Sequence, residues 1–312
     1  MKTGIYLSYV GLGANLLHLS YCHQIAKKNG PVTIITLCKN LEAALADDPL
    51  IDKVFYIDQY HKKLIDILKL SKILKKFNLK NLLIFYPSIR LYLSAKLAGI
   101  DHIWIYSFFK KKNLHLVNAA KKLTEDFLKI DDCPTETNFF IKKEKLDKFN
   151  KENYNSKFKI VIGAGSSGPT TRWGSKNFSD LINQLNKSES YFFFILCGPN
   201  EKEIENEIIS KVNKKNYISL SEKSIEDLIP FLCASDMYVG NDSFGSHITS
   251  QSGKKSIVML LDSPKAYTDY SNNYHRIIPK GYRIEEITHG TNADPNLITV
   301  EDVIETINRI KN

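Results

Sequence analysis

The feature that most constrains the fold is a regular alternation of short apolar segments with longer amphipathic ones. In the first half of the chain, the segments of strand character are Gly4–Tyr9, Val32–Leu37, Val54–Ile57, Leu82–Tyr86 and His102–Tyr106. The segments of helical periodicity are Ala14–Lys28, His61–Phe77, Ile89–Leu97 and Leu114–Leu128. Strands separated by helices of this length predict a parallel sheet with helices on both faces.

The second half repeats this architecture without repeating the sequence. Its predicted strands are Lys159–Ile162, Phe192–Cys197, Tyr217–Leu220, Ser256–Leu261 and a short run that begins at Met237. Its predicted helices are Phe178–Asn186, Glu201–Val212, Ser224–Cys233, Thr299–Ile310 and one that ends at Gly253. With 312 residues, the chain has room for two domains of about 150 residues each. We therefore predict an α/β fold of two Rossmann-like domains facing each other across a cleft: residues 1–142, a polar linker of residues 143–157, with a partly helical linker as the alternative, and residues 158–312.

The stretch Met237–Gly253 carries the clearest functional signal. It reads as a strand that breaks at Gly240, followed by polar residues and then a helix. Asp242 and Ser243 are predicted to cap the first free N–H groups of this helix, although Asp242 could be a helix cap and nothing more. Those N–H groups and the positive end of the helix dipole suit an anionic ligand such as a diphosphate. The stretch predicts a site for a nucleotide or a nucleotide-sugar.

Other nucleotide-binding and metal-binding classes fit the sequence less well. The Gly11-Leu12-Gly13 segment is predicted to be a turn, but it lacks the third glycine of the dinucleotide fingerprint, and no acidic residue ends the second strand. This argues against a dehydrogenase. The five cysteines are scattered and form no C-x-x-C pair, so neither a disulfide framework nor a zinc site is indicated. No metal or other cofactor is expected.

The excess of positive over negative charge lies entirely in the first half of the chain. Residues 1–150 hold 24 Lys and Arg against 14 Asp and Glu, whereas residues 151–312 hold 19 against 20. A basic first half suits an anionic partner such as a phosphorylated glycan or an acidic membrane face, unless the lysines form ordinary solvated helix faces. Because the chain is poor in Arg and has no basic-aromatic motif, no nucleic acid is expected. The apolar runs are shorter than the roughly 20 residues that span a bilayer, and the first residues read as a buried strand, so we expect a cytoplasmic protein.

Four blocks of the second half resemble glycosyltransferase family 9, the ADP-heptose:lipopolysaccharide heptosyltransferases. Residues 241–247, NDSFGSH, are similar to the family's G-N-D-[ST]-G-P-x-H signature, with Phe244-Gly245 in place of Gly-Pro. The other similar blocks are Gly163–Ser166 with residues 171–174, TRWG; residues 197–201, CGPNE; and residues 224–236. The resemblance implies a GT-B fold, with the nucleotide-sugar in the second domain and a lipid-linked, anionic acceptor in the first.

The resemblance also implies the residues of the two sites. Those implied for donor binding are Gly163, Ser166, Thr171, Arg172, Gly198, Asn241, Asp242, Ser243, Phe244, Gly245 and His247. Those implied for acceptor binding are Gly13, Asn15 and His115. Arg172 stands beside Thr171, which replaces a diphosphate-binding Lys of the family; the alternative is a surface Arg stacked on Trp173. His247 and His115 each have a structural role as the alternative.

One departure from the family pattern concerns catalysis. The family has a Gly-Asp pair at the N-terminal turn, where the Asp is held to be the general base, and this chain has Gly13-Ala14. Alanine cannot accept a proton, so His18, about one helical turn further on, is the candidate base, with a structural histidine as the alternative. The predicted function is a metal-independent, inverting transfer of a sugar, heptose above all, from a nucleoside diphosphate such as ADP to a lipopolysaccharide core or related glycan, with peripheral contact with the inner membrane surface. The alternatives are a catalytically silent homologue that binds nucleotide-sugar or glycan, and a nucleotide-sugar epimerase.

Overall fold

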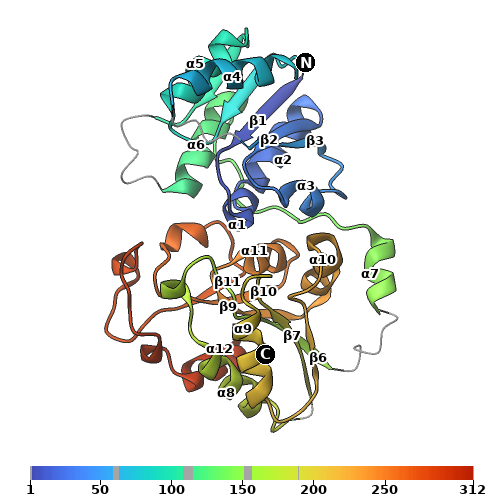
Figure 1. The fold of residues 1–312 in the computed structure, drawn as a ribbon, viewed down its shortest axis with the longest axis vertical. Helices are drawn as coiled ribbons and strands as arrows, with labels where there is room; N and C mark the ends of the chain where they lie inside the picture. Colours follow the sequence, from blue (N-terminus) through green and yellow to red (C-terminus); the bar gives the residue numbers. More distant parts are fainter. Residues whose placement is uncertain (1, 59–62, 108–114, 151–156, 189, 312) are drawn as a thin grey trace. The chain divides into compact units, whose positions relative to one another are not determined.

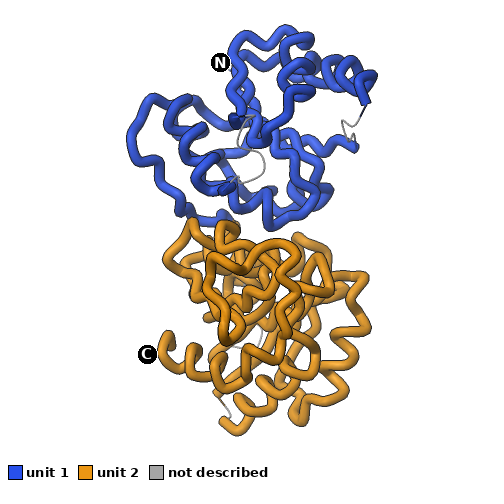
Figure 2. The backbone as a smooth tube through the Cα atoms, turned by 90° about the vertical axis from the view of Figure 1, so that its left-hand side faces the viewer, with its two compact units in different colours: residues 1–140 blue, residues 141–312 orange. Residues whose placement is uncertain are grey.

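The computed structural model describes residues 2–58, 63–107, 115–150, 157–188 and 190–311. The chain divides into two compact units, residues 1–140 and residues 141–312, which are coloured separately in Figure 2. Each unit contains one fully parallel sheet with helices packed on it. The starts of two predicted helices, at His61 and Leu114, and residues 151–156 of the predicted linker lie outside the described residues.

Unit 1 is built on a five-stranded sheet of order β3-β2-β1-β4-β5. The strands are β1 (Thr3–Leu7), β2 (Val32–Thr36), β3 (Ile51–Tyr56), β4 (Asn81–Ile84) and β5 (His102–Ile105). The helices are α1 (Leu12–Leu16), α2 (Leu19–Asn29), α3 (Leu41–Ala44), α4 (Ile65–Lys75), α5 (Ile89–Leu97) and α6 (Leu116–Leu128). Strand β1 is buried along its whole length, which explains why it reads as an almost continuous apolar run.

The first helical region differs from the prediction in two ways. The predicted turn at residues 11–13 is wrong, because Leu12 and Gly13 already belong to α1. The single predicted helix is also wrong, because it is interrupted between α1 and α2 (Figure 1). At the break, the ring nitrogen Nδ1 of His18 lies 2.7 Å from the Ala14 carbonyl oxygen, the group that its own backbone N–H would use in a continuous helix. That N–H bonds to the Asn15 carbonyl instead, so a side chain competes with the backbone and ends the helix.

Unit 2 is built on a six-stranded sheet of order β11-β10-β9-β6-β7-β8. The strands are β6 (Phe158–Gly163), β7 (Tyr191–Leu196), β8 (Tyr217–Ser219), β9 (Met237–Asn241), β10 (Lys255–Met259) and β11 (Tyr274–Ile277). The helices are α7 (Lys143–Asn150), α8 (Ser175–Leu185), α9 (Lys202–Lys211), α10 (Ile225–Ala234), α11 (Phe244–Gln251) and α12 (Val300–Lys311). Short 3-10 turns occur at Pro169–Thr171, Lys265–Tyr267, Ile284–Glu286 and Pro295–Leu297.

Two elements of unit 2 were not predicted as they are. The edge strand β11 has the sequence YHRI, whose polar residues gave no strand signal. The segment predicted as a linker forms α7, which packs on α10 of the same unit: Phe149 meets Phe231 edge to face, and Lys145 pairs with Glu226. Phe149 is buried, so this polar helix is anchored by a single aromatic side chain.

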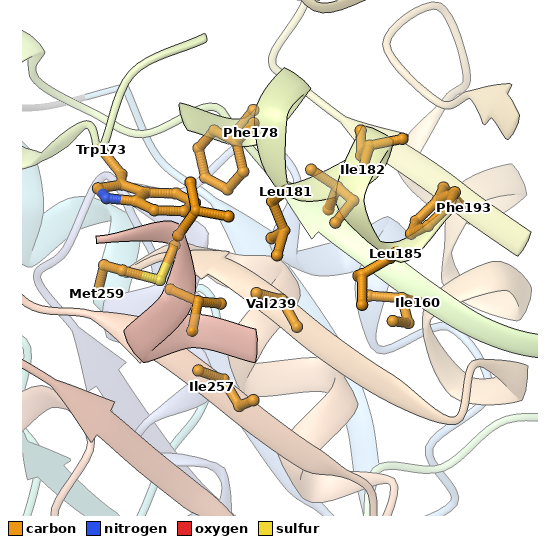
Figure 3. Packing of buried hydrophobic residues seen from close by; sticks show 14 of the residues in the cluster. Ile160, Trp173, Phe178, Leu181, Ile182, Leu185, Phe193, Val239, Ile257 and Met259 are labelled. Atoms are coloured by element: carbon orange, nitrogen blue, oxygen red, sulfur yellow. The ribbon is translucent and has the colours of Figure 1, made fainter. Parts of the chain in front are cut away.

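The core of unit 2 fills the space between α8, α12 and the sheet. Figure 3 shows Trp173 and Phe178 packed against each other next to Met259 and Val239. The indole N–H of Trp173 donates to the Ile298 carbonyl oxygen at 2.8 Å, so the only polar atom of this side chain is satisfied in the core. The loop that follows β6 is therefore fixed to the body of the unit by a large buried anchor.

Candidate functional site

The two central strands of the unit 2 sheet, β6 and β9, mark the point where the chain changes direction. From β6 the chain builds outward through β7 and β8, and from β9 it builds to the other side through β10 and β11. In open parallel sheets, ligands bind outside the carboxyl ends of the strands at such a switch point. Gly163, the last residue of β6, is the register partner of Gly240 in β9. The candidate site is the group of loops that leaves the sheet at this edge.

The glycines here are required by close packing and not by turn conformation. A Cβ added to Gly240 would lie 2.4 Å from the Gly163 carbonyl oxygen, and one added to Gly163 would lie 1.8 Å from the Tyr238 hydroxyl oxygen. A Cβ on Gly245 would lie 2.5 Å from Leu196. The predicted break at Gly240 is therefore wrong: β9 continues to Asn241. Instead, the glycines let two strands and a helix start surround the buried ring of Tyr238.

Tyr238 and Asn241 fix the course of the loops around these glycines. The Tyr238 hydroxyl donates to the Asn241 carbonyl oxygen at 2.7 Å and lies 2.9 Å from the Ser243 hydroxyl. The Asn241 side chain accepts from the Trp173 backbone N–H at 2.9 Å and donates to the Ala164 carbonyl oxygen at 2.7 Å. Because Asn241 is fully buried with both ends of its amide engaged, it positions the loop after β6.

Glu201 joins the loops that follow β6 and β7. Its carboxylate accepts from the backbone N–H groups of Ser166 and Gly198, at 2.9 and 2.6 Å, and from the Arg172 guanidinium at 2.7 Å. A Cβ on Gly198 would lie 2.9 Å from this carboxylate, which gives that glycine its role. The sequence placed Glu201 in a family-like block but did not assign it a role. The sequence pattern that could have predicted this role is an acidic residue at the start of a helix, three positions after Gly198.

Arg172 lies beside Glu201 and not on Trp173, whose side chain is fully buried in the core. The Arg172 side chain is 30% exposed, and its Nη2 also donates to the Ser166 carbonyl oxygen at 3.2 Å. Its Nε atom is buried and has no hydrogen-bond partner. Thr171 bonds within the same loop, to the Gly168 carbonyl oxygen and to the Ser166 hydroxyl. The guanidinium is thus held at the loop with part of its donor capacity unused.

Asp242 is the most perturbed carboxylate at this edge of the sheet. Its side chain is 8% exposed, and its Oδ1 atom has no hydrogen-bond partner. Burial raises the pKa of Asp242 to about 6, against the opposing effects of a hydrogen bond from Ser263 and of the nearby His289. A buried carboxylate atom without a partner costs free energy, and such atoms in native structures are concentrated at functional sites. Asp242 does not cap α11, because the cap residue is Ser243.

His247 lies behind Asp242 on α11. Its Nε2 is 3.8 Å from the Asp242 Oδ1, and its Nδ1 is 2.8 Å from the Tyr270 hydroxyl oxygen. The ring stacks on Tyr270, and burial lowers the pKa of His247 to about 3, so the histidine is neutral at physiological pH. The adjacent carboxylate favours the tautomer with the proton on Nε2, and Nδ1 then accepts from a tyrosine hydroxyl. His247 therefore lies next to Asp242 inside the unit without a hydrogen bond to it.

The start of α11 supplies backbone donors next to these side chains. The first N–H groups of any helix have no acceptor within the helix. The Ser243 side chain makes no capping hydrogen bond in α11, contrary to the prediction, because its hydroxyl is engaged with Tyr238. The N–H groups of Phe244 and Gly245, on the first turn, therefore lie at a helix end that suits an anion.

Two further loops complete this edge and were missed from sequence. Asp262, after β10, accepts from the Thr170 hydroxyl at 2.6 Å and from the backbone N–H groups of Gly290 and Thr291. These hydrogen bonds lower the pKa of Asp262 despite its burial. The adjoining His289 Nε2 lies 3.0 Å from the Tyr267 hydroxyl oxygen. The one sequence feature that points to these loops is Asp262, a single acidic residue shortly after a strand.

The four residues predicted for catalysis and acceptor binding lie in unit 1, and two of them, His18 and Asn15, are buried. His18 is fully buried, stacks on Tyr9, and uses its second ring nitrogen, Nε2, in a 3.1 Å hydrogen bond with Tyr106. Burial lowers the pKa of His18 to about 4, opposed in part by the hydrogen bond to Ala14. Both ring nitrogens are occupied and no part of the ring reaches solvent, which argues against His18 as the general base.

Asn15, Gly13 and His115 also have structural roles. The Asn15 amide donates to the carbonyl oxygens of Tyr9 and Gly11 and accepts from the Thr36 hydroxyl, so it fixes the loop after β1. The Gly13 carbonyl oxygen accepts from Leu17 at the end of α1. His115 caps α6 by accepting from the Asn118 N–H.

Two general properties of the described residues bear on the class of protein. Within the described ranges, no three His, Cys, Asp or Glu side chains gather in a way that could hold a metal ion. None of the helices in those ranges combines the length and the apolar character that a membrane crossing requires.

Comparison with known proteins agrees with this architecture. A family model for glycosyltransferase family 9 (heptosyltransferase) matches residues 101–285, more than half of the chain. The chain therefore belongs to glycosyltransferase family 9. Lipopolysaccharide heptosyltransferase 1 of Campylobacter coli is 22% identical over 290 residues, which cover 85% of each chain.

Solved structures show the same fold over almost the whole chain. An ADP-heptose lipopolysaccharide heptosyltransferase II from E. coli matches with a TM-score of 0.77 and 16% identity, covering 99% of this chain and 98% of its own. A family 9 glycosyltransferase from Veillonella parvula matches with a TM-score of 0.78 and 16% identity, covering 99% and 96%. The prediction of a GT-B fold with two parallel-sheet α/β domains is confirmed.

Proposed function

We propose that this protein transfers a heptose, or a closely similar sugar, from a nucleoside diphosphate donor to the core of a lipopolysaccharide or a related anionic glycan. Membership of the heptosyltransferase family supports the reaction class. ADP-heptose is the favoured donor because the similar E. coli protein is an ADP-heptose lipopolysaccharide heptosyltransferase. The observation that carries the proposal is the carboxyl edge of the unit 2 sheet, where a buried Asp242 with an unpartnered oxygen adjoins the start of α11.

The donor site proposed here lies in unit 2, within the predicted second domain of residues 158–312. The N–H groups at Phe244 and Gly245 and the guanidinium of Arg172 would face the diphosphate, because both supply positive charge at the switch-point edge. Asp242 would accept hydrogen bonds from hydroxyl groups of the donor through its unused oxygen. The remaining donor-site residues act through these groups: Gly163, Ser166, Thr171, Gly198, Asn241, Ser243 and His247 shape or fix the loops.

The proposed reaction is a direct displacement with inversion at the anomeric carbon. A bond forms between the acceptor oxygen and that carbon, and the bond to the diphosphate oxygen breaks with its electron pair leaving on the diphosphate. Backbone N–H groups aimed at the developing charge stabilise the leaving group without a metal ion. The acceptor hydroxyl must also lose its proton, and His18 is not placed to take it.

The acceptor site is proposed in unit 1, whose basic charge suits an anionic glycan at the cytoplasmic face of a membrane. A specific observation supports the alternative function, a homologue that binds nucleotide-sugar without turnover. Ala14 replaces the Asp of the family pattern, and the candidate substitute is sealed in the core. The loop after β1, from Ser8 to Gly11, contains hydroxyl groups and no carboxylate.

Two measurements test the proposal. In a thermal-shift panel of ADP, GDP and UDP, the cognate nucleotide raises the melting temperature by mass action, and Asp242→Ala with Arg172→Ala reduces that shift. A transfer assay with ADP-heptose and a heptose-deficient lipopolysaccharide then separates the two functions. Transfer establishes the enzyme, and nucleotide binding without transfer establishes the silent homologue. Release of an isomerised nucleotide-sugar identifies an epimerase, and no nucleotide binding contradicts the proposal outright.

A further inference from the structure

Helices α4 and α5 of unit 1 expose a concentration of large apolar side chains. Ten large hydrophobic residues are exposed among the described residues, and six of them lie on α4 or its cap residue and on α5. They are Leu64, Ile65, Leu68, Ile89, Leu93 and Leu97. Leu64 is 78% exposed and Leu97 is 60% exposed. A cluster of exposed apolar side chains on a folded protein marks a surface that is covered by something else.

The two helices present this surface as one layer. Helices α4 and α5 pack against each other (Figure 1). Leu70 and Leu74 of α4 and Leu91 and Ala95 of α5 enter the same buried cluster with Tyr6 of the sheet. Both helices therefore cover the same face of the sheet, and their opposite sides point away from it. On α5 the exposed side chains recur at positions i, i+4 and i+8, which places Ile89, Leu93 and Leu97 on one stripe.

Lysines occupy the same exposed sides as the apolar residues. On α4 and just after it, Lys69, Lys72, Lys75 and Lys76 are exposed, and at 100° per residue they fall in the same arc as Leu64, Ile65 and Leu68. Residues 63–100 contain seven Lys and one Arg against a single acid, Asp66. The Asp66 carboxylate accepts from the backbone N–H of Lys63. We call the exposed sides of α4 and α5, with these lysines, the Leu/Lys face.

We propose that the Leu/Lys face is a docking surface for an anionic lipid bilayer. Leucine and isoleucine side chains enter the boundary between headgroups and acyl chains, while the long lysine side chains extend to the phosphates around them. An anionic leaflet attracts the cluster through its surface potential. Only the biological reason for membrane binding rests on the proposed function: an enzyme with a lipid-linked acceptor works at a membrane surface.

The charge also argues against a second copy of this chain as the occupant. Pairing two Leu/Lys faces would bring two strongly positive surfaces together, and like charges that are desolvated in an interface cost several kcal/mol. A bilayer that contains anionic lipid supplies apolar and negative partners together.

Sedimentation with lipid vesicles tests the proposal, using the full chain without nucleotide. Vesicles of phosphatidylcholine with added phosphatidylglycerol are expected to bind the protein, vesicles of phosphatidylcholine alone to bind it less, and added salt to release it. Lys72→Gln with Lys75→Gln should weaken binding to the anionic vesicles about 25-fold at low salt, from about fivefold for each lysine. Leu93→Gln with Leu97→Gln should weaken it at least about tenfold through lost apolar burial.

Matched changes in unit 2 serve as controls. Lys187 and Lys215 are exposed lysines, and Leu297 is an exposed leucine, so Lys187→Gln with Lys215→Gln and Leu297→Gln should leave vesicle binding within about twofold of wild type. Variants of the Leu/Lys face should keep the nucleotide-dependent thermal shift, which separates failure of this proposal from failure of the donor site. Equal binding to both kinds of vesicle, equal loss in the face and control variants, or a dimer that the leucine changes disrupt without affecting vesicles would each overturn the proposal.

Discussion

The switch points of the two sheets have the same topology and opposite chemistry. In unit 1, the residues that follow β1 and β4 at the switch point contact His18, which is neutral, fully buried and hydrogen-bonded through both ring nitrogens. In unit 2, the switch point lies between β6 and β9, and β9 is followed directly by Asp242, a buried carboxylate with an unpartnered oxygen. A fold therefore offers a place for a site, and only the side chains at that place decide whether a site exists.

His18 and Asp242 are also expected to differ in what they contribute to stability. The surroundings of His18 are aromatic, with Tyr9 stacked on the ring and Phe85 at its edge. The surroundings of Asp242 keep a charge out of water and leave one of its oxygens without a hydrogen bond. Mutation of His18 should reduce stability alone, whereas mutation of Asp242 should change ligand binding, with either sign for stability.

The largest effect is expected at Gly240. In Gly240→Ala the new methyl would lie within 2.4 to 2.7 Å of backbone atoms of Gly163, and backbone in the centre of a sheet cannot move aside. We expect a loss of about 3–5 kcal/mol in the free energy of unfolding.

The matched control is Gly11→Ala at the unit 1 switch point, where a Cβ meets nothing within 4 Å and φ is −73°. It should be neutral or slightly stabilising in urea denaturation. Similar curves for both variants would contradict the packing argument.

Glu201 should give the next largest effect. Glu201→Ala removes the acceptor for Arg172 and for the N–H groups of Ser166 and Gly198. Removing one partner of a partly buried ion pair that also serves backbone donors should cost about 2–4 kcal/mol and weaken nucleotide binding.

The control for Glu201 is Glu207→Ala, which removes the exposed pair with Lys211 and an exposed hydrogen bond from the Ser175 hydroxyl and should cost less than about 1 kcal/mol. Urea denaturation and nucleotide titration of both variants measure the contrast. A Glu201→Ala variant that binds nucleotide as well as wild type would separate this carboxylate from the site.

Asp242→Asn should stabilise the protein at neutral pH while impairing donor binding. Because the pKa of Asp242 is raised to about 6, its contribution favours the folded state below about pH 4 and is lost as the pH rises through 6. The neutral Asn avoids that loss, so the variant should gain up to about 3 kcal/mol at pH 8 and nothing at pH 4.

Urea denaturation at the two pH values, combined with nucleotide binding at pH 8, tests this prediction. A stability gain with lost binding identifies a site residue. A stability loss at pH 8 would instead make Asp242 a structural carboxylate.

Much of the fold follows from local patterns. Strand positions, their parallel arrangement and two α/β domains could be predicted because buried parallel strands are apolar runs between helices. The failures arose from tertiary contacts. The break at His18 depends on the hydrogen bond between its ring nitrogen and the Ala14 carbonyl oxygen. Strand β11 depends on pairing with β10, and its polar residues do not predict a strand. The charged segment after residue 141 became a helix because Phe149 finds a pocket of aromatic rings on α10 and β7.

The candidate site was only partly predictable. The edge of the sheet and the importance of Asp242 follow from the strand and helix signals of one short stretch. The roles of Asn241 and Glu201 do not, because each depends on contacts with residues about 30 to 80 positions away. The burial of His18 could not be predicted for the same reason: the sequence places this residue near a loop, and only the packing shows that its ring lies in the core.

The smallest effect is expected for His18→Phe, which tests whether the residue at the unit 1 switch point has only a structural role. Phenylalanine keeps the stacking on Tyr9 but leaves the Tyr106 hydroxyl without its partner, at a cost of about 1–2 kcal/mol near pH 8. Because burial lowers the pKa of His18 to about 4, wild type loses stability as the pH falls from 6.5 towards 4, since only the unfolded chain takes up the proton. The variant lacks this dependence, so the difference between the two proteins should shrink or reverse at pH 4.5.

Nucleotide binding and any transfer activity of His18→Phe should stay within about threefold of wild type, whereas loss of a general base typically costs about 10²- to 10⁴-fold. A fall of that size in a folded variant would restore His18 to the reaction and remove the contrast between the two switch points.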